Sequence, residues 1–99
     1  MKSEIGIIGY GRFGHFAAHH LKHHFRVSVA DSTRRRIETG IHRSGLREAA
    51  GKEIVLLAVP ISKLRGVLLA IAPEVQKGAI ICDVCSVKEE PLRWMKDSL

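Results

Sequence analysis

The sequence predicts an α/β fold with a parallel, doubly wound sheet, and three observations lead to that prediction. Short apolar runs alternate with segments of helical periodicity along the whole chain. The first apolar run passes directly into a turn with three glycines and then into a helix-like segment. An acidic residue follows the second apolar run, at the edge where parallel strands end. We therefore expect one small domain over residues 1–99.

The first half of the chain alternates between strand-like and helix-like segments. Residues 4–8 form a nearly continuous apolar run, typical of a parallel strand covered on both faces. Residues 12–24 repeat small and apolar side chains at helical spacing, and residues 25–30 alternate like a second strand. We expect a short helix within residues 33–42 and a brief third strand near residues 40–42.

The second half continues the alternation. Residues 46–50 predict a helical turn that ends at a glycine, and residues 53–59 are the most strand-like run of the chain. Residues 62–72 form an amphipathic helix pattern closed by a proline, and residues 79–83 predict the next strand. A final helix is expected after residue 88.

The turn after the first strand reads Gly9-Tyr10-Gly11-Arg12-Phe13-Gly14, a Gly-x-Gly-x-x-Gly pattern. In dinucleotide-binding βαβ units, the first glycine allows the tight turn, the second admits a pyrophosphate, and the third lets the helix pack on the strand. The anion then lies on free N–H groups at the helix N-terminus. The flanking strand and helix favour this interpretation over an ordinary tight turn. We therefore expect a Rossmann-like dinucleotide-binding domain.

Asp31 follows the second strand at about the distance expected for the acid that hydrogen-bonds a ribose 2′-hydroxyl. A carboxylate there repels a 2′-phosphate, so NAD is the predicted cofactor. Arg34, Arg35 and Arg36 come almost directly afterwards and could neutralise such a phosphate. NADP therefore stays the alternative.

Charge and hydropathy bear on other function classes. The formal charge of +6 comes from scattered basic residues, and only 5% of residues are aromatic, so nucleic acid is not the predicted partner. A positive field also favours an anionic cofactor or substrate.

No apolar run approaches the roughly 18 residues of a membrane span, and the first strand begins too early for a signal peptide. We expect a cytoplasmic protein that does not contact membranes.

Two further patterns bear on metal or redox chemistry. Cys82 and Cys85 form a Cys-x-x-Cys, but Cys82 belongs to an apolar run where a buried strand thiol is expected, and no second ligand pair is near. The first helix-like segment also carries histidines at spacings that could coordinate a metal ion, although they lie outside the apolar face of that segment. These are His15, His19, His20, His23 and His24. We expect a solvated face and no metal site.

Three motifs lie along the chain: residues 5–14 with the glycine turn, Leu57-Ala58-Val59-Pro60, and Asp83-Val84-Cys85-Ser86-Val87-Lys88. Together they resemble the cofactor-binding half of prephenate and arogenate dehydrogenases, and the resemblance spans essentially the whole chain. The third motif is the most specific for this family, since the other two also occur in imine reductases and hydroxyacid dehydrogenases. Cys85 stands where the family often has glycine.

The resemblance implies NAD(P)-dependent oxidative decarboxylation of a cyclohexadienyl substrate in tyrosine biosynthesis. It implies that Ser86 lies beside the nicotinamide and the substrate hydroxyl; Ser86 also stands three positions before Glu89, in capping-box spacing. The family's catalytic histidine and substrate-binding arginine would lie beyond Leu99, in a helical second domain. The residues expected around the cofactor are Gly9, Tyr10, Gly11, Arg12, Phe13, Gly14, Asp31, Ser32, Arg34, Val59, Pro60 and Asp83.

Two function classes follow from these observations. The first is the cofactor-binding part of a prephenate or arogenate dehydrogenase, inactive without its substrate domain. The second is a stand-alone nucleotide-sensing module, since regulatory domains of potassium-transport systems also use Gly-x-Gly-Arg-Phe-Gly. Residues 83–88 favour the first class.

We further expect a homodimer, because the edge strand at residues 79–83 and the apolar residues after it would lack a second domain to pack on. Those residues are Leu92, Trp94, Met95 and Leu99.

Overall fold

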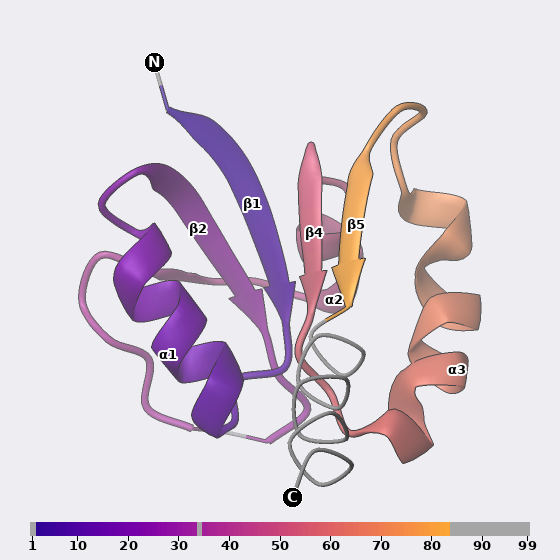
Figure 1. Ribbon diagram of the computed structural model, residues 1–99, viewed down its shortest axis with the longest axis horizontal. Helices are drawn as coiled ribbons and strands as arrows, with labels where there is room; N and C mark the ends of the chain where they lie inside the picture. The colour runs from indigo at the N-terminus through magenta and orange to yellow at the C-terminus, as the bar shows by residue number, and fades with distance from the viewer. Residues whose placement is uncertain (1, 34, 84–99) are drawn as a thin grey trace, which may run out of the picture.

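The computed structural model describes residues 2–33 and 35–83 of the chain. Strands and helices alternate along most of it, although no helix lies between β2 and β3 in the described residues (Figure 1). The elements, in chain order, are β1 (Ser3–Ile8), α1 (Arg12–Leu21), β2 (Phe25–Ala30), β3 (His42–Arg43), α2 (Leu46–Ala50), β4 (Ile54–Leu57), α3 (Ile61–Ile71), the 3₁₀ helix η1 (Ala72–Glu74) and β5 (Ile80–Asp83). The final helix expected after residue 88 lies outside the described residues.

The strands form one parallel sheet in the order β3-β2-β1-β4-β5. This is the strand order of a doubly wound nucleotide-binding fold, in which the direction of winding reverses between β1 and β4. Ligands bind such sheets outside the carboxyl ends of the strands, at that reversal. The predicted Rossmann-like fold is confirmed, and it places the glycine turn at the expected edge of the sheet.

Two hydrophobic clusters lie on opposite faces of the sheet, because side chains alternate along each strand. One cluster joins Ile7 of β1 and Val29 of β2 to Ala18 of α1. The other joins residues of β1, β2 and β4 to Ala49 of α2 and Ile71 of α3. Helix α1 therefore covers one face of the sheet, and α2 and α3 cover the other.

Two of the expected helices differ from the structure. Helix α1 ends at Leu21 rather than His24, because residues 22–24 form the turn that lets β2 run parallel to β1. The expected helix within residues 33–42 is wrong for the described residues 35–40, which form a loop and a turn. Tertiary contacts hold this loop: Ile37 and Ile41 pack against the cluster on the α1 face. The brief third strand is found one or two positions later, as β3.

Cys82 is exposed, so its expected burial is wrong. The apolar run indicated a buried thiol, but β5 lies at the end of the described sheet, the edge position expected for residues 79–83, and pairs with β4. Ile80 and Ile81 of the same strand are 59% and 44% exposed. An edge strand buries less of each side chain than a central one, and the apolar sequence alone does not distinguish the two.

Candidate functional site

The turn between β1 and α1 depends on Gly9 and Gly14, where the backbone leaves no room for a side chain. Gly9 has a φ of +102°, and a Cβ there would lie 2.4 Å from the carbonyl oxygen of Ala58. A Cβ on Gly14 would lie 2.1 Å from the carbonyl oxygen of Gly9, so α1 packs directly on the turn. The N–H of Gly9 donates to the carbonyl of Ala30 at 2.7 Å, which ties the turn to β2. Both positions therefore require glycine.

Gly11 differs from these two glycines, because a side chain would fit there. It is the N-cap residue of α1 with a φ of −74°, and the nearest atom to an added Cβ is Nη1 of Arg35, 3.9 Å away. The first turn of α1 contains no acidic side chain. The backbone at Gly11 is therefore open, beside the N–H groups of a helix N-terminus that suit an anion.

A pocket of about 350 Å³ opens beside Gly11. It is lined by Tyr10, Gly11, Arg12, His15, Arg35 and Arg36. Three of the lining residues are arginines, which bind phosphate groups through charge and through their planar fork of donors. In this kind of fold the loop after β2 recognises the adenosine ribose. The pocket lies between that loop and the glycine turn, so its place and charge fit the adenosine end of a dinucleotide.

Asp31 follows β2 and is paired with Arg35. Its Oδ2 accepts a hydrogen bond of 2.8 Å from Nη1 of Arg35. The side chain of Asp31 is 7% exposed, and that of Arg35 is 45% exposed. The sequence predicted opposing influences from Asp31 and the arginines, and the structure joins one of those arginines to the carboxylate.

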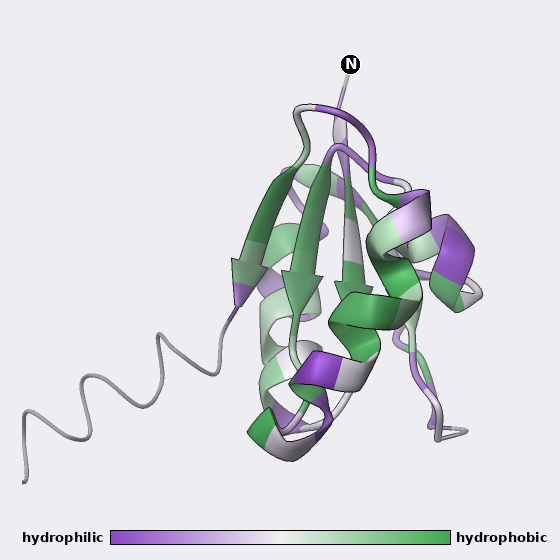
Figure 2. Ribbon diagram, turned by 90° about the vertical axis from the view of Figure 1, so that its right-hand side faces the viewer, coloured by the Kyte–Doolittle hydropathy of each residue, from purple (hydrophilic) through white to green (hydrophobic). Residues whose placement is uncertain are grey.

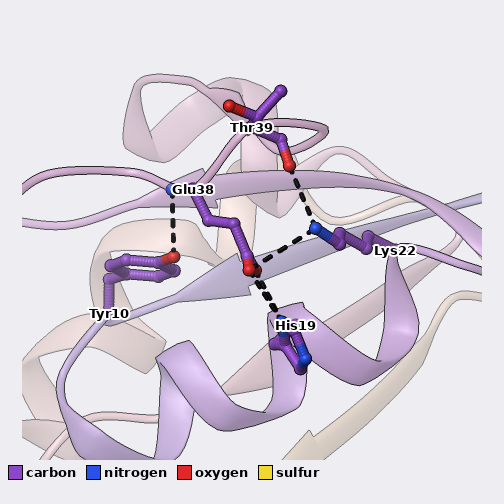
Figure 3. A network of polar contacts seen from close by, with 5 residues as sticks. All are labelled: Tyr10, His19, Lys22, Glu38 and Thr39. Atoms are coloured by element: carbon purple, nitrogen blue, oxygen red, sulfur yellow. Dashed lines mark hydrogen bonds and ion pairs between the residues drawn. The ribbon is translucent and has the colours of Figure 1, made fainter.

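A network of polar contacts holds the loop after β2 against α1 (Figure 3). The carboxylate of Glu38 accepts hydrogen bonds of 2.7 and 2.8 Å from Nδ1 of His19, and lies 3.4 Å from Nζ of Lys22. Lys22 also donates to the carbonyl of Thr39 at 3.1 Å, and the N–H of Glu38 donates to the hydroxyl of Tyr10 at 3.3 Å. The hydrogen bond from His19, supported by the charge of Lys22, lowers the pKa of Glu38 below its ordinary value of 4.5. Glu38 is therefore ionised at neutral pH and ties the loop to α1.

Sequence reasoning missed this network. Tyr10 lines the pocket beside Gly11, but the residue is only 3% exposed and belongs to the core on the α1 face, and its hydroxyl accepts a hydrogen bond from the N–H of Glu38. Its expected place beside the pyrophosphate stays a prediction. The partners lie far apart in the chain: 19 positions separate His19 from Glu38, and 28 separate Tyr10 from Glu38. No local pattern signals such a contact.

The other predicted site residues lie around the same edge of the sheet. Ser32 is exposed just after Asp31, and Phe13 is 36% exposed in the first turn of α1. Val59 follows β4 and lies beside the turn, since a Cβ on Gly9 would be 3.2 Å from its Cγ1. Pro60 is the N-cap residue of α3.

Asp83 ends β5 opposite Leu57 of β4, at the carboxyl edge of the sheet. It is half-buried. Arg34 and Ser86, and most of the motif that contains Ser86, lie outside the described residues.

The histidines of α1 and the turn after it are all exposed, as predicted for a solvated face. In the part of the chain that the structure describes, no three His, Cys, Asp or Glu side chains gather so as to hold a metal ion. No helix within residues 2–33 and 35–83 is both long enough and apolar enough to cross a membrane.

A model of the family described as prephenate dehydrogenase, nucleotide-binding domain, matches residues 18–99. The chain belongs to this family. The match begins inside α1, so residues 9–14 of the glycine turn lie outside it. The geometry of the turn is thus an observation independent of the family assignment, and it agrees with a nucleotide-binding fold.

Two curated relatives have names that agree with the prephenate dehydrogenase family. A cyclohexadienyl dehydrogenase from Zymomonas mobilis is 33% identical over 96% of this chain, and a probable arogenate/prephenate dehydrogenase from Methanocaldococcus jannaschii is 41% identical over 50% of it. The alignments cover 36% and 11% of those two proteins. The chain therefore spans about a third or less of the length of these relatives.

Among solved structures, the chain is similar to a D-isomer specific 2-hydroxyacid dehydrogenase from Xanthobacter autotrophicus in complex with NADPH and MES. The TM-score is 0.71 and the identity 28%, over 83% of this chain and 37% of that one.

Proposed function

We propose that this chain binds a nicotinamide dinucleotide, with the pyrophosphate over Gly11 and the adenosine end in the pocket beside Arg35. The open backbone at Gly11 carries the proposal, because the two glycines around it are closely packed and Gly11 alone leaves space for a ligand. The family of nucleotide-binding domains and the NADPH complex of the similar 2-hydroxyacid dehydrogenase support the same class of ligand.

Residues at the carboxyl ends of the central strands would hold the two halves of the cofactor. Gly9 to Phe13 would surround the pyrophosphate, and Asp31 would contact the adenosine ribose, with Ser32 and Arg34 close to it in the chain. Val59, Pro60 and Asp83, which end or follow β4 and β5, would line the other half. The nicotinamide ring supplies the hydride acceptor when the cofactor is bound.

We further propose that the chain is the cofactor-binding part of a prephenate or arogenate dehydrogenase. The names of the relatives and the motif of residues 83–88 support oxidative decarboxylation of a cyclohexadienyl substrate, with Ser86 positioned near the substrate hydroxyl. The 99 residues alone are expected to bind cofactor without turnover. A cytoplasmic location and a homodimer belong to the same proposal.

The binding proposal is tested by replacing Gly11 with valine and titrating NADH by fluorescence or calorimetry. A valine side chain would fill the space that the phosphates need, so binding should be lost. The matched control is Gly45→Val, since Gly45 is also an N-cap glycine with a φ of −79° and has nothing within 4 Å of an added Cβ. The control should bind NADH as the wild type does. Unchanged binding in Gly11→Val would refute the proposed site.

A further inference from the structure

The ion pair of Asp31 and Arg35 occupies the place where a dinucleotide fold distinguishes NAD from NADP. In such folds an acid after β2 binds the ribose hydroxyls of NAD, whereas an arginine nearby accommodates the 2′-phosphate of NADP. This chain carries both groups, 2.8 Å apart. The pairing changes what Asp31 presents to a ligand, because the positive guanidinium of Arg35 lies directly against the carboxylate.

Arg35 can contact a ligand in the pocket while it stays paired with Asp31. Its side chain is 45% exposed and lines the pocket beside the glycine turn, where its Nη1 lies 3.9 Å from the position of a Cβ on Gly11. A guanidinium has five N–H donors, so one hydrogen bond to Asp31 leaves others for a phosphate. Arg36 lines the same pocket and adds a second positive charge.

The backbone that carries Arg35 is held from several sides. The guanidinium of Arg43 in β3 donates to the carbonyl of Arg35. Three residues further along, Glu38 is bound to His19, Lys22 and Tyr10 (Figure 3). A loop held in this way presents a charged side chain at lower entropic cost than a free one, which favours selective binding.

We infer that Arg35 is the residue that admits NADP to this site, by neutralising Asp31 and offering its remaining donors to the 2′-phosphate. The inference rests on the proposed dinucleotide function. Asp31 keeps acceptor capacity for ribose hydroxyls, because a carboxylate oxygen accepts more than one hydrogen bond. The wild-type chain therefore binds both NAD and NADP, and removal of Arg35 turns it into an NAD-selective protein.

The test measures dissociation constants for NAD and NADP, and for the adenosine fragments 5′-AMP and 2′,5′-ADP, on the full 99-residue chain. The variants are Arg35→Ala and Arg35→Gln; the glutamine variant keeps a donor for Asp31 and so guards against loss of folding. Arg26→Gln is the charge-matched control, since Arg26 is exposed at the opposite end of β2.

Both Arg35 variants should raise the ratio of the NADP to the NAD dissociation constant by about tenfold, as expected for one charge-assisted hydrogen bond. The 2′,5′-ADP to 5′-AMP ratio should rise in parallel, and Arg26→Gln should change neither. Unchanged ratios in the Arg35 variants, an equal change in Arg26→Gln, or a wild type that binds NAD but not NADP would overturn the inference. A wild type that binds neither dinucleotide would instead refute the proposed function.

Discussion

Nδ1 of His19 donates to both oxygens of the Glu38 carboxylate, at 2.7 and 2.8 Å, and so joins α1 to the loop after β2. Helix α1 begins at the glycine turn, and the loop carries Arg35 and Arg36 of the pocket. The contact therefore links the two segments that would enclose the adenosine end of a cofactor. Its strength depends on the charge of Glu38, which makes it testable by pH.

We expect the stabilisation from Glu38 to be lost in acid. The pKa of Glu38 in the folded protein is below its ordinary value of 4.5, so the folded state favours the ionised carboxylate. The stabilisation is therefore complete above about pH 4.5 and disappears as the pH falls through the folded pKa. The difference in Tm between the wild type and Glu38→Gln should shrink between about pH 6 and about pH 3. A constant difference across this range would contradict the prediction.

The close packing of Gly14 predicts a large effect of one methyl group. In Gly14→Ala the new Cβ would lie 2.1 Å from the carbonyl oxygen of Gly9, so the helix or the turn must move. We expect a loss of about 1–3 kcal/mol or more in the free energy of unfolding, measured by urea denaturation. Gly66→Ala is the control: Gly66 lies in α3 with nothing within 4 Å of an added Cβ. Alanine there should stabilise the protein by up to about 1 kcal/mol, and equal effects at both positions would rule out the packing argument.

The chain alone should bind cofactor but not act as a dehydrogenase. Turnover needs the substrate held at reaction distance and a base for its hydroxyl proton, each worth orders of magnitude in rate. The resemblance places the histidine and arginine for these tasks outside residues 1–99. The measurement is NADH or NADPH production from prephenate and from arogenate, with a cyclohexadienyl dehydrogenase as the positive control. Steady production by the purified 99-residue chain would refute this prediction.

Exposed apolar side chains predict self-association through β5 and α3. Ile80 of β5 is 59% exposed and Leu69 of α3 is 69% exposed, and Figure 2 shows apolar colour along both elements on the side that faces the viewer. A second copy could add its own β5 to the edge of the sheet and cover this surface. Light scattering at micromolar concentration should give the mass of a dimer, and Ile80→Lys should shift it toward the monomer. A monomeric wild type would contradict the prediction.

The amino-acid sequence was sufficient to predict the α/β class, the place of the glycine turn and the order of strands and helices apart from the helix expected within residues 33–42. These features depend on local information. The alternating or continuous apolar side chains of residues 25–30 and 53–59 indicate strands, because each pattern lies within a single strand. The glycines at positions 9 and 14 belong to a turn between two elements that are adjacent in the chain. Their spacing along the chain therefore carries the signal, and the structure agrees with it at β2, β4 and α1.

Only the tertiary structure decided which side chains meet across the loop after β2. The expected helix within residues 33–42 gave way to a loop because Glu38 is bound by Tyr10, His19 and Lys22, and none of these contacts can be read from nearby positions. The same holds for the exposure of Cys82, which depends on β5 lying at the end of the described sheet. Asp31 and Arg35 are close in sequence, but their pairing requires the loop to bring the guanidinium back to the carboxylate. Free energies of such contacts depend on distance in space, which the order of residues does not specify.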